Sequence, residues 1–174
     1  DHQGHVSVLD YPEGLRELVE DEEVFGLSHI ESADKRADFV SLGWAMSRNY
    51  KGPIPRARYI RIDAGVGTPI IEQAPSARGG VLKWDVTAAG FAAVESVESA
   101  GIVGTGGGRD ILTALDYGAS RVNAFEINPK VHHAVEGPFR ELSGGPYSLP
   151  GVTAKIGEAR SQIRGTGPYD VVEL

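Results

Sequence analysis

A glycine-rich loop followed at a distance by an acid is the part of this sequence best suited to chemistry. Residues 100 to 128 read AGIVGTGGGRDILTALDYGASRVNAFEIN, an apolar run, a glycine loop, a helical segment and a second apolar run. The glycines of the loop are Gly104, Gly106, Gly107 and Gly108. Without a Cβ they let the backbone approach a ligand closely. Glu126 ends the second run, and its carboxylate can accept hydrogen bonds from both ribose hydroxyls. This order is typical of sites that hold the nucleoside part of a cofactor.

The spacing of the glycines distinguishes two kinds of nucleoside site. The dinucleotide pattern G-x-G-x-x-G would need glycine at position 109, where the chain has Arg109. The pattern G-x-G-x-G, which is common where S-adenosylmethionine or a relative binds, is matched instead. A glycine turn between packed elements, with no ligand, is the alternative interpretation.

Other candidate residues follow the expected strands. Ile127, beside Glu126, is a candidate cofactor-binding residue. Glu158 and Ala159 could border an adenine, although Glu158 could equally be an ordinary acid at a helix N-terminus, where the helix dipole favours it. Asp110 leaves the same choice open, between a ligand contact and a first-turn acid.

A metal site is not expected. The adjacent pair His132 and His133 would point in different directions on a helix, and neither has a histidine partner four residues away.

Alternating strands and helices would position these residues. The patterns predict strands at 101–104, 121–127, 152–156 and 169–174, with helices at 109–117, 129–135 and 158–163 between them. Strands separated by helices imply a parallel sheet, so we expect an α/β Rossmann-like domain over residues 81–174. Its first helix is expected at 85–99, capped by Asp85 or Thr87.

The region before this domain, residues 1–80, is expected to carry a β-hairpin at about 57–72. ARYIRID alternates as a half-buried strand does, and AGVG and TPIIE follow as a turn and a return strand. A helix is predicted at 12–22, and residues 33–46 form either a helix or an irregular stretch. Residues 1–10 carry no clear signal.

Composition excludes several function classes. The formal net charge of −7 makes the chain a poor binder of nucleic acid, which attracts clustered Lys and Arg. No cysteine is present, which removes disulfides, thiolate metal sites and cysteine nucleophiles. Apolar runs fall far short of the roughly 20 residues that span a bilayer, so we expect no membrane contact in this part of the chain.

The chain starts with Asp1 and stops at Leu174 inside an expected strand, so we interpret it as a fragment of a longer protein, incomplete at its C-terminus.

These motifs together resemble the spermidine synthase-like group of the class I S-adenosylmethionine-dependent methyltransferase fold, over roughly residues 44 to 174. VGTGGGRDILTALDYGA resembles the first nucleoside-binding motif of the group, and FEINP its acidic ribose motif. GGPYSLPGVTAKIGEARS is similar to the segment that leads to an adenine-contacting acid, here Glu158, and YDVVEL to the next core strand. WAMSR and RIDAGVGT look like the small β-region that precedes the catalytic domain.

The chain also departs from the group's pattern. Asp63 and Thr68 stand where the hairpin motif L-D-G-x-x-Q-T has its Asp and Thr, but Gly67 replaces the glutamine that helps hold the nucleoside. The Tyr-x-Glu-Met and nearby His of the next helix are not found, and Gly107 stands where the synthases carry an Asp. The resemblance places the catalytic aspartate one position beyond Leu174, so we expect the fragment alone to be inactive.

The first functional hypothesis is therefore a transferase domain that uses S-adenosylmethionine or its decarboxylated form and passes a methyl or aminopropyl group to a nucleophile. The glycines would bound the donor's tail, Glu126 would hold the ribose, and the hairpin around Asp63 would cover the site. A nucleoside-binding module that has lost its chemistry, and an NAD-binding oxidoreductase, are the alternatives. The resemblance implies a cytoplasmic protein, or the cytoplasmic domain of a membrane-attached one, and leaves a homodimer open.

Overall fold

The computed structural model describes residues 6–11, 46–47, 49–52, 55, 57–62, 66–72 and 80–174. The larger of its two sheets is parallel, with strands in the order β6-β5-β4-β7. These strands are β4 (Ser99–Val103), β5 (Arg121–Glu126), β6 (Val152–Ile156) and β7 (Val171–Glu173). All four strands predicted for the domain are present, and the chain has the α/β Rossmann-like arrangement expected from its sequence.

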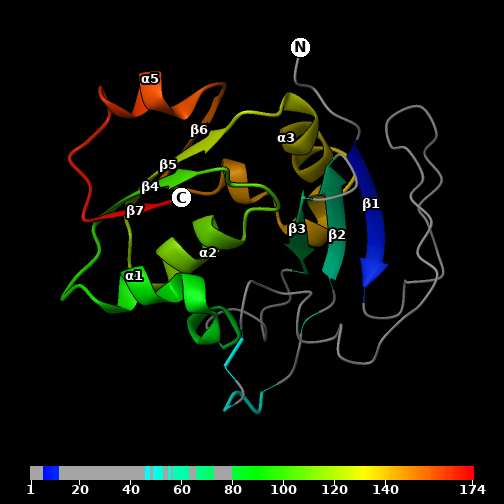
Figure 1. Cartoon of the computed structure of the whole chain (residues 1–174), viewed down its shortest axis with the longest axis horizontal. Helices are drawn as coiled ribbons and strands as arrows, with labels where there is room; N and C mark the ends of the chain where they lie inside the picture. Colours follow the sequence, from blue (N-terminus) through cyan, green and yellow to red (C-terminus); the bar gives the residue numbers. More distant parts are fainter. Residues whose placement is uncertain are drawn as a thin grey trace.

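Helices connect these strands and cover the sheet on both sides. They are α1 (Ala89–Ala92), α2 (Arg109–Asp116), α3 (Pro129–Glu136), α4 (Arg140–Ser143) and α5 (Ala159–Ile163), with the 3-10 turns η3 (Leu82–Trp84), η4 (Val86–Ala88) and η5 (Pro146–Ser148). Figure 1 shows α1 and α2 on one side of the sheet and α5 on the other. The strand order reverses between β4 and β7, and sheets of this kind bind ligands at the carboxyl ends of the strands around such a point.

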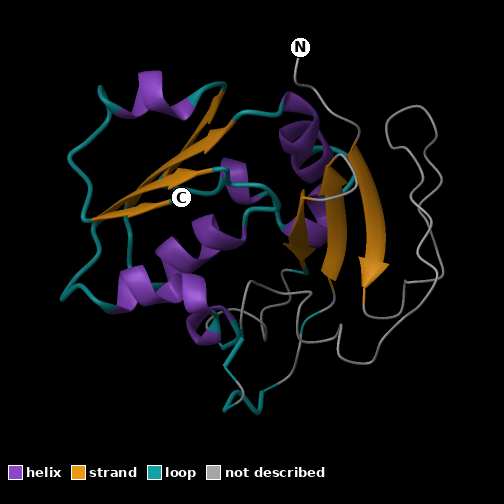
Figure 2. Cartoon of the chain, viewed as in Figure 1, coloured by secondary structure: helices purple, strands orange, loops and turns teal. Residues whose placement is uncertain are grey.

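A second, antiparallel sheet lies beside the carboxyl ends of the parallel strands, as Figure 2 shows. Its strands are β1 (Val6–Tyr11), β2 (Ala57–Ile62) and β3 (Val66–Ile71), in that order. The predicted hairpin is confirmed as β2 and β3, which pair from Ala57 with Ile71 to Ile62 with Val66. β1 pairs along the whole of β2. Its sequence carried no recognised signal because its extended conformation depends on a partner about fifty residues away.

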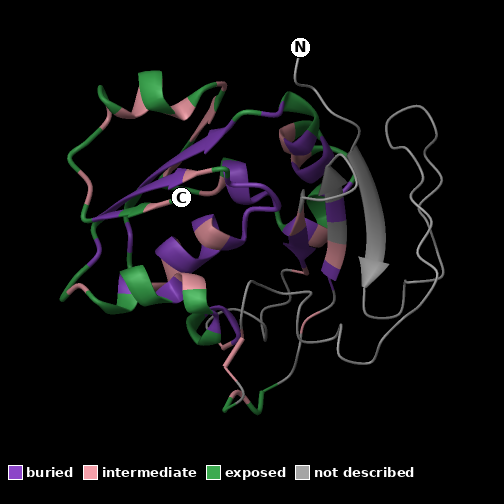
Figure 3. Ribbon diagram, viewed as in Figure 1, coloured by how far each residue is buried: buried purple, intermediate pink, exposed green. Residues whose placement is uncertain are grey.

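The core lies between the parallel sheet and the helices. β5 is buried at five of its six residues, which is the pattern of a strand covered on both faces. From α2, Ile111 and Ala114 are fully buried against this sheet. Figure 3 shows the burial concentrated on β4, β5 and the inner side of α2. The glycine loop and the end of β5 are therefore carried by a deeply buried part of the domain.

The predicted helix at 85–99 is wrong in its extent. Asp85 does cap the start of the segment, since its side chain accepts a 3.0 Å hydrogen bond from the Thr87 N–H. Only the turn η4 and the single helical turn α1 follow, however, and strand β4 begins at Ser99. The N–H groups of Glu98 and Ser99 donate to the Asp170 carboxylate at 3.0 and 2.8 Å. A long-range partner thus takes the backbone donors that a continued helix would have used.

The cap predicted for α3 is present. Asn128 accepts a 3.0 Å hydrogen bond from the Lys130 N–H, and Pro129 is the first helical residue. The expected helix at 12–22 and nearly all of the segment 33–46 lie outside the described residues.

Candidate functional site

The glycine loop joins β4 to α2 in a conformation that needs glycine at several positions. Gly104, Gly106 and Gly108 have φ values of 71°, 53° and 88°. Residues with a Cβ rarely adopt this left-handed region, because it places the Cβ against the following carbonyl. The loop lies at the carboxyl end of β4, which is the edge that the sequence predicts for the site.

Every backbone N–H from Gly104 to Gly108 donates a hydrogen bond within the protein. Gly104 and Thr105 both donate to the Phe125 carbonyl, at 2.9 and 3.3 Å, and Gly108 donates to the Thr105 carbonyl at 2.9 Å. The Gly106 N–H donates to Glu126 Oε2 at 2.9 Å, and the Gly107 N–H donates to Thr68 Oγ1 at 3.0 Å. The loop therefore presents none of its own N–H groups to an anion.

Protein atoms fill the space beside three of the glycines. A Cβ on Gly106 would lie 2.5 Å from Thr68 Oγ1, one on Gly107 would lie 1.8 Å from the Pro69 carbonyl oxygen, and one on Gly108 would lie 2.3 Å from Pro146 Cγ. A Cβ on Gly104, by contrast, would meet nothing within 4 Å. Close packing against β3 and η5 thus explains Gly106, Gly107 and Gly108, while Gly104 borders open space.

Glu126 lies beside the loop, at the edge that the sequence predicts, and it contacts the loop directly. Its residue is 4% exposed. Oε2 accepts from the Gly106 N–H, and Oε1 accepts from the Asn128 N–H at 2.8 Å. A carboxylate has about four acceptor positions, so these two bonds leave capacity for hydroxyl groups of a ligand.

Two side chains that were not predicted as site residues hold the loop. The Tyr147 hydroxyl donates to the Gly106 carbonyl oxygen at 2.7 Å and accepts from Thr105 Oγ1 at 2.8 Å. Thr68 reaches Gly107 from strand β3. For Thr68 the hairpin motif was a usable signal, but its contact joins residues 39 positions apart. The sequence contained no comparable signal for Tyr147.

Ile127 and Glu158 lie at the same edge, but Glu158 has another role there. Its two oxygens accept from the Arg160 and Ser161 N–H groups at 2.8 and 2.9 Å, so it caps α5, which begins at Ala159. These backbone hydrogen bonds lower the pKa of Glu158. Ile127 is 67% exposed, and Ile156, at the end of the neighbouring strand, is 42% exposed. Asp63 lies outside the described residues.

A charged cluster occupies the point where the strand order reverses. Arg109, which is buried, forms two hydrogen bonds to Asp110, at 2.9 and 3.0 Å, and lies 4.0 Å from Asp85 Oδ2. Asp85 Oδ2 is buried with no hydrogen-bond partner among the described residues. Burial raises the pKa of Glu173, the last residue of β7, and the charge of Asp110 raises it further. Asp110, predicted as either a ligand contact or a first-turn acid, is thus engaged mainly by Arg109.

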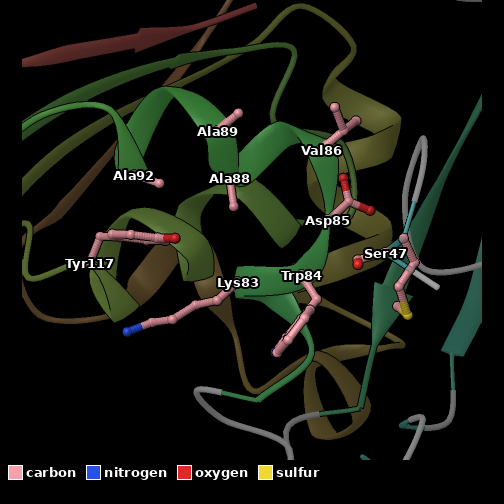
Figure 4. A pocket seen from close by; sticks show the side chains of 10 residues that line it. Ser47, Lys83, Trp84, Asp85, Val86, Ala88, Ala89, Ala92 and Tyr117 are labelled. Atoms are coloured by element: carbon pink, nitrogen blue, oxygen red, sulfur yellow. The ribbon is translucent and has the colours of Figure 1, made fainter. Parts of the chain in front are cut away.

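An open hollow of about 470 Å³ lies away from the glycine loop. Its lining comprises Met46, Ser47, Lys83, Trp84, Asp85, Val86, Ala88, Ala89, Ala92 and Tyr117. Figure 4 shows Asp85 toward one end and Tyr117 with Lys83 toward the other. Apart from Asp85 its residues belong to neither the glycine loop nor the charged cluster, so we do not assign the predicted chemistry to it.

Two further properties bear on ligands and surroundings. Within the described ranges, His, Asp and Glu side chains do not gather in groups of three that could hold a metal ion. Among the described helices, none combines the length and the apolar character needed to cross a bilayer.

Comparison with protein-family models and with curated proteins finds no match to this chain.

Proposed function

We propose that this chain binds the adenosine part of S-adenosylmethionine, or of its decarboxylated form, at the carboxyl edge of the parallel sheet. In this proposal it is a domain of the class I methyltransferase fold that serves transfer of a methyl or aminopropyl group. The observation that carries the proposal is the direct contact of Glu126 with a glycine loop whose N–H groups are all used inside the protein.

That observation favours a nucleoside donor over a dinucleotide. A pyrophosphate is bound by free backbone N–H groups of a glycine loop and by a helix N-terminus. Here the five loop donors from 104 to 108 are occupied. S-adenosylmethionine carries a positive sulfonium and no phosphate, so it needs no such donors.

Three residues at this edge offer contacts to such a ligand. Gly104 faces open space and leaves room for the donor's tail. Glu126 has acceptor positions for the ribose hydroxyls, and the exposed side chain of Ile127 offers an apolar surface for the adenine. The sulfonium is already activated, so the protein has mainly to align donor and acceptor and, for an amine acceptor, to remove a proton.

Calorimetry tests this proposal with S-adenosylmethionine, methylthioadenosine and NAD as separate ligands. We expect the two sulfur nucleosides to bind and NAD to bind far more weakly. Binding of NAD alone would reject the proposal in favour of an oxidoreductase.

The base contact can be tested with Ile127→Ala. Because Ile127 is 67% exposed, its truncation should leave the fold intact. If the adenine packs on it, affinity should fall about fivefold, which corresponds to about 1 kcal/mol of lost apolar burial. Val86→Ala is the matched control, since Val86 is 54% exposed and lies on η4. Equal affinity of the Ile127 variant and the wild type would remove Ile127 from the site.

A second candidate is a module of the same fold that binds the nucleoside without turnover. The synthases that this sequence resembles carry a glutamine at the position of Gly67, and glycine has no side chain to hold a ligand. This difference favours the second candidate. Tight binding of methylthioadenosine, without transfer of a group to any amine, would support this candidate over the transferase.

A further inference from the structure

The peptide unit that joins Gly106 to Gly107 is held from two sides. Its carbonyl oxygen, on Gly106, accepts a 2.7 Å hydrogen bond from the Tyr147 hydroxyl. Its N–H, on Gly107, donates a 3.0 Å hydrogen bond to Thr68 Oγ1. The C=O and N–H of a trans peptide point in opposite directions, so the two side chains grip the unit from opposite sides.

This unit needs outside support because the backbone itself hardly selects its orientation. Both flanking residues are glycines, whose dihedral angles meet few steric limits. Rotation of the unit would turn the carbonyl toward Thr68 and the N–H toward Tyr147, and both hydrogen bonds would break. It would also disturb Gly106, whose own N–H donates to the proposed ribose acid Glu126 at 2.9 Å.

Tyr147 is itself fixed in place. It is 3% exposed, its ring packs edge-on against His132 with centroids 4.8 Å apart, and its backbone N–H donates to Glu136 Oε1 at 2.9 Å. Thr105 Oγ1 donates to its hydroxyl oxygen, which directs the single hydroxyl proton to Gly106. Burial raises the pKa of Tyr147, and the charge of Glu126 raises it further, so the hydroxyl remains a donor.

We propose that Tyr147 and Thr68 are positioning residues that clamp the Gly106–Gly107 peptide unit and so keep the glycine loop in the shape that binds the nucleoside. The inference rests on the proposed function, because the loop acts on the ligand through this shape. Thr68 belongs to β3 and Tyr147 to η5, so the clamp also joins the antiparallel sheet to the loop of the parallel one.

The test removes each hydroxyl while keeping the packing. Tyr147→Phe and Thr68→Val are the test variants, and Thr68→Ser keeps a hydroxyl at position 68. Tyr169→Phe and Thr113→Val are matched controls, because each removes a hydroxyl hydrogen bond that does not involve the loop peptide. All are compared at a temperature well below their melting temperatures.

Two measurements are made on each variant, methylthioadenosine affinity by calorimetry and microsecond-to-millisecond exchange of the Gly106 and Gly107 amides by NMR relaxation dispersion. We expect Tyr147→Phe and Thr68→Val to show new exchange at these amides and to bind about 3- to 10-fold more weakly, as loss of one hydrogen bond implies. Thr68→Ser and both controls should match the wild type in affinity, even where their melting temperatures fall.

The clamp is overturned if the test variants bind as tightly as the wild type, or if the controls weaken binding equally. Failure of the proposed function gives a different result, because then the wild type itself binds no adenosine ligand. In that case the NMR measurement still decides on the clamp. New exchange at Gly106 and Gly107 supports it, and unchanged amides in both test variants refute it.

Discussion

The two ends of strand β7 place an acid in opposite surroundings. At the amino end, the exposed carboxylate of Asp170 accepts from the Glu98 N–H, the Ser99 N–H and the Ser99 hydroxyl, at 3.0, 2.8 and 3.0 Å. These bonds lower the pKa of Asp170. At the carboxyl end, burial and the charge of Asp110 raise the pKa of Glu173. The amino edge of the sheet gives its carboxylate three hydrogen-bond donors, whereas the carboxyl edge buries its carboxylate near another negative charge.

The charged groups at the amino edge therefore stabilise the fold, whereas some of those at the carboxyl edge oppose it. At the amino edge the Arg121 guanidinium completes the network with bonds of 2.8 Å to the Thr166 and Pro168 carbonyls. At the carboxyl edge three carboxylates surround the one guanidinium of Arg109, and Asp85 Oδ2 lacks a hydrogen-bond donor among the described residues. The carboxyl edge thus keeps buried charge that its hydrogen bonds compensate only in part.

The largest difference between the edges should come from adding one methyl group to a glycine. Gly107→Ala would place a Cβ 1.8 Å from the Pro69 carbonyl oxygen, a backbone atom that cannot move alone. We expect a loss of about 3 kcal/mol in the free energy of unfolding, at the upper end of overpacking effects. Urea unfolding followed by circular dichroism measures it.

Gly165→Ala is the control at the other end of the sheet, since its Cβ would meet nothing within 4 Å. It should change stability by less than about 1 kcal/mol, the range of alanine substitutions at unstrained glycines. Equal losses for the two variants would contradict the close packing of β3 on the loop.

A smaller loss is expected from Glu126→Gln. The side-chain amide can present only one carbonyl oxygen, whereas the Gly106 and Asn128 N–H groups each need an acceptor. We expect a loss of about 2 kcal/mol, because a buried donor is left opposite an NH₂ group. Glu158→Gln should lower the melting temperature less, since Glu158 is exposed and water can replace it. If the two variants lose stability equally, Glu126 does not hold the loop.

Local patterns in the sequence predicted the four parallel strands and the hairpin, and they placed Glu126 at the same edge as the glycine loop. Parallel strands end at one edge, so an acid after β5 had to lie near the residues after β4. What local patterns could not predict is the packing around the glycines. Pro69 and Tyr147 lie about forty residues from the loop on either side. Their contacts depend on how two sheets meet, and neither spacing nor propensity encodes that.

Glu173→Gln should raise the stability of the protein, whereas the substitutions above lower it. A raised pKa in the folded state means that the ionised carboxylate opposes folding above its ordinary value of 4.5. Removal of the charge should therefore raise stability at pH 7, by less than about 1 kcal/mol because the group is partly exposed and solvent screens it. Melting temperatures measured from pH 7 down to pH 4 should show the gain shrinking toward pH 4. A loss at pH 7 would mean that the attraction of Arg109 outweighs burial and Asp110.

Asp170→Asn also tests how a carboxylate makes stability depend on pH, but here the loss of charge should lower stability. Its expected effect is the smallest. A lowered pKa means that the charge stabilises the folded state above the ordinary value of 3.8, and that this stability is lost as the pH falls through the lower folded value. Asparagine keeps one acceptor oxygen, so the variant loses the charge rather than the whole network. We expect it to melt slightly below the wild type at pH 7, and the two melting temperatures to converge below pH 3.8. The Glu173 and Asp170 variants should thus shift melting in opposite directions at pH 7. If both shift it in the same direction, the two edges do not differ in the way their carboxylates are held.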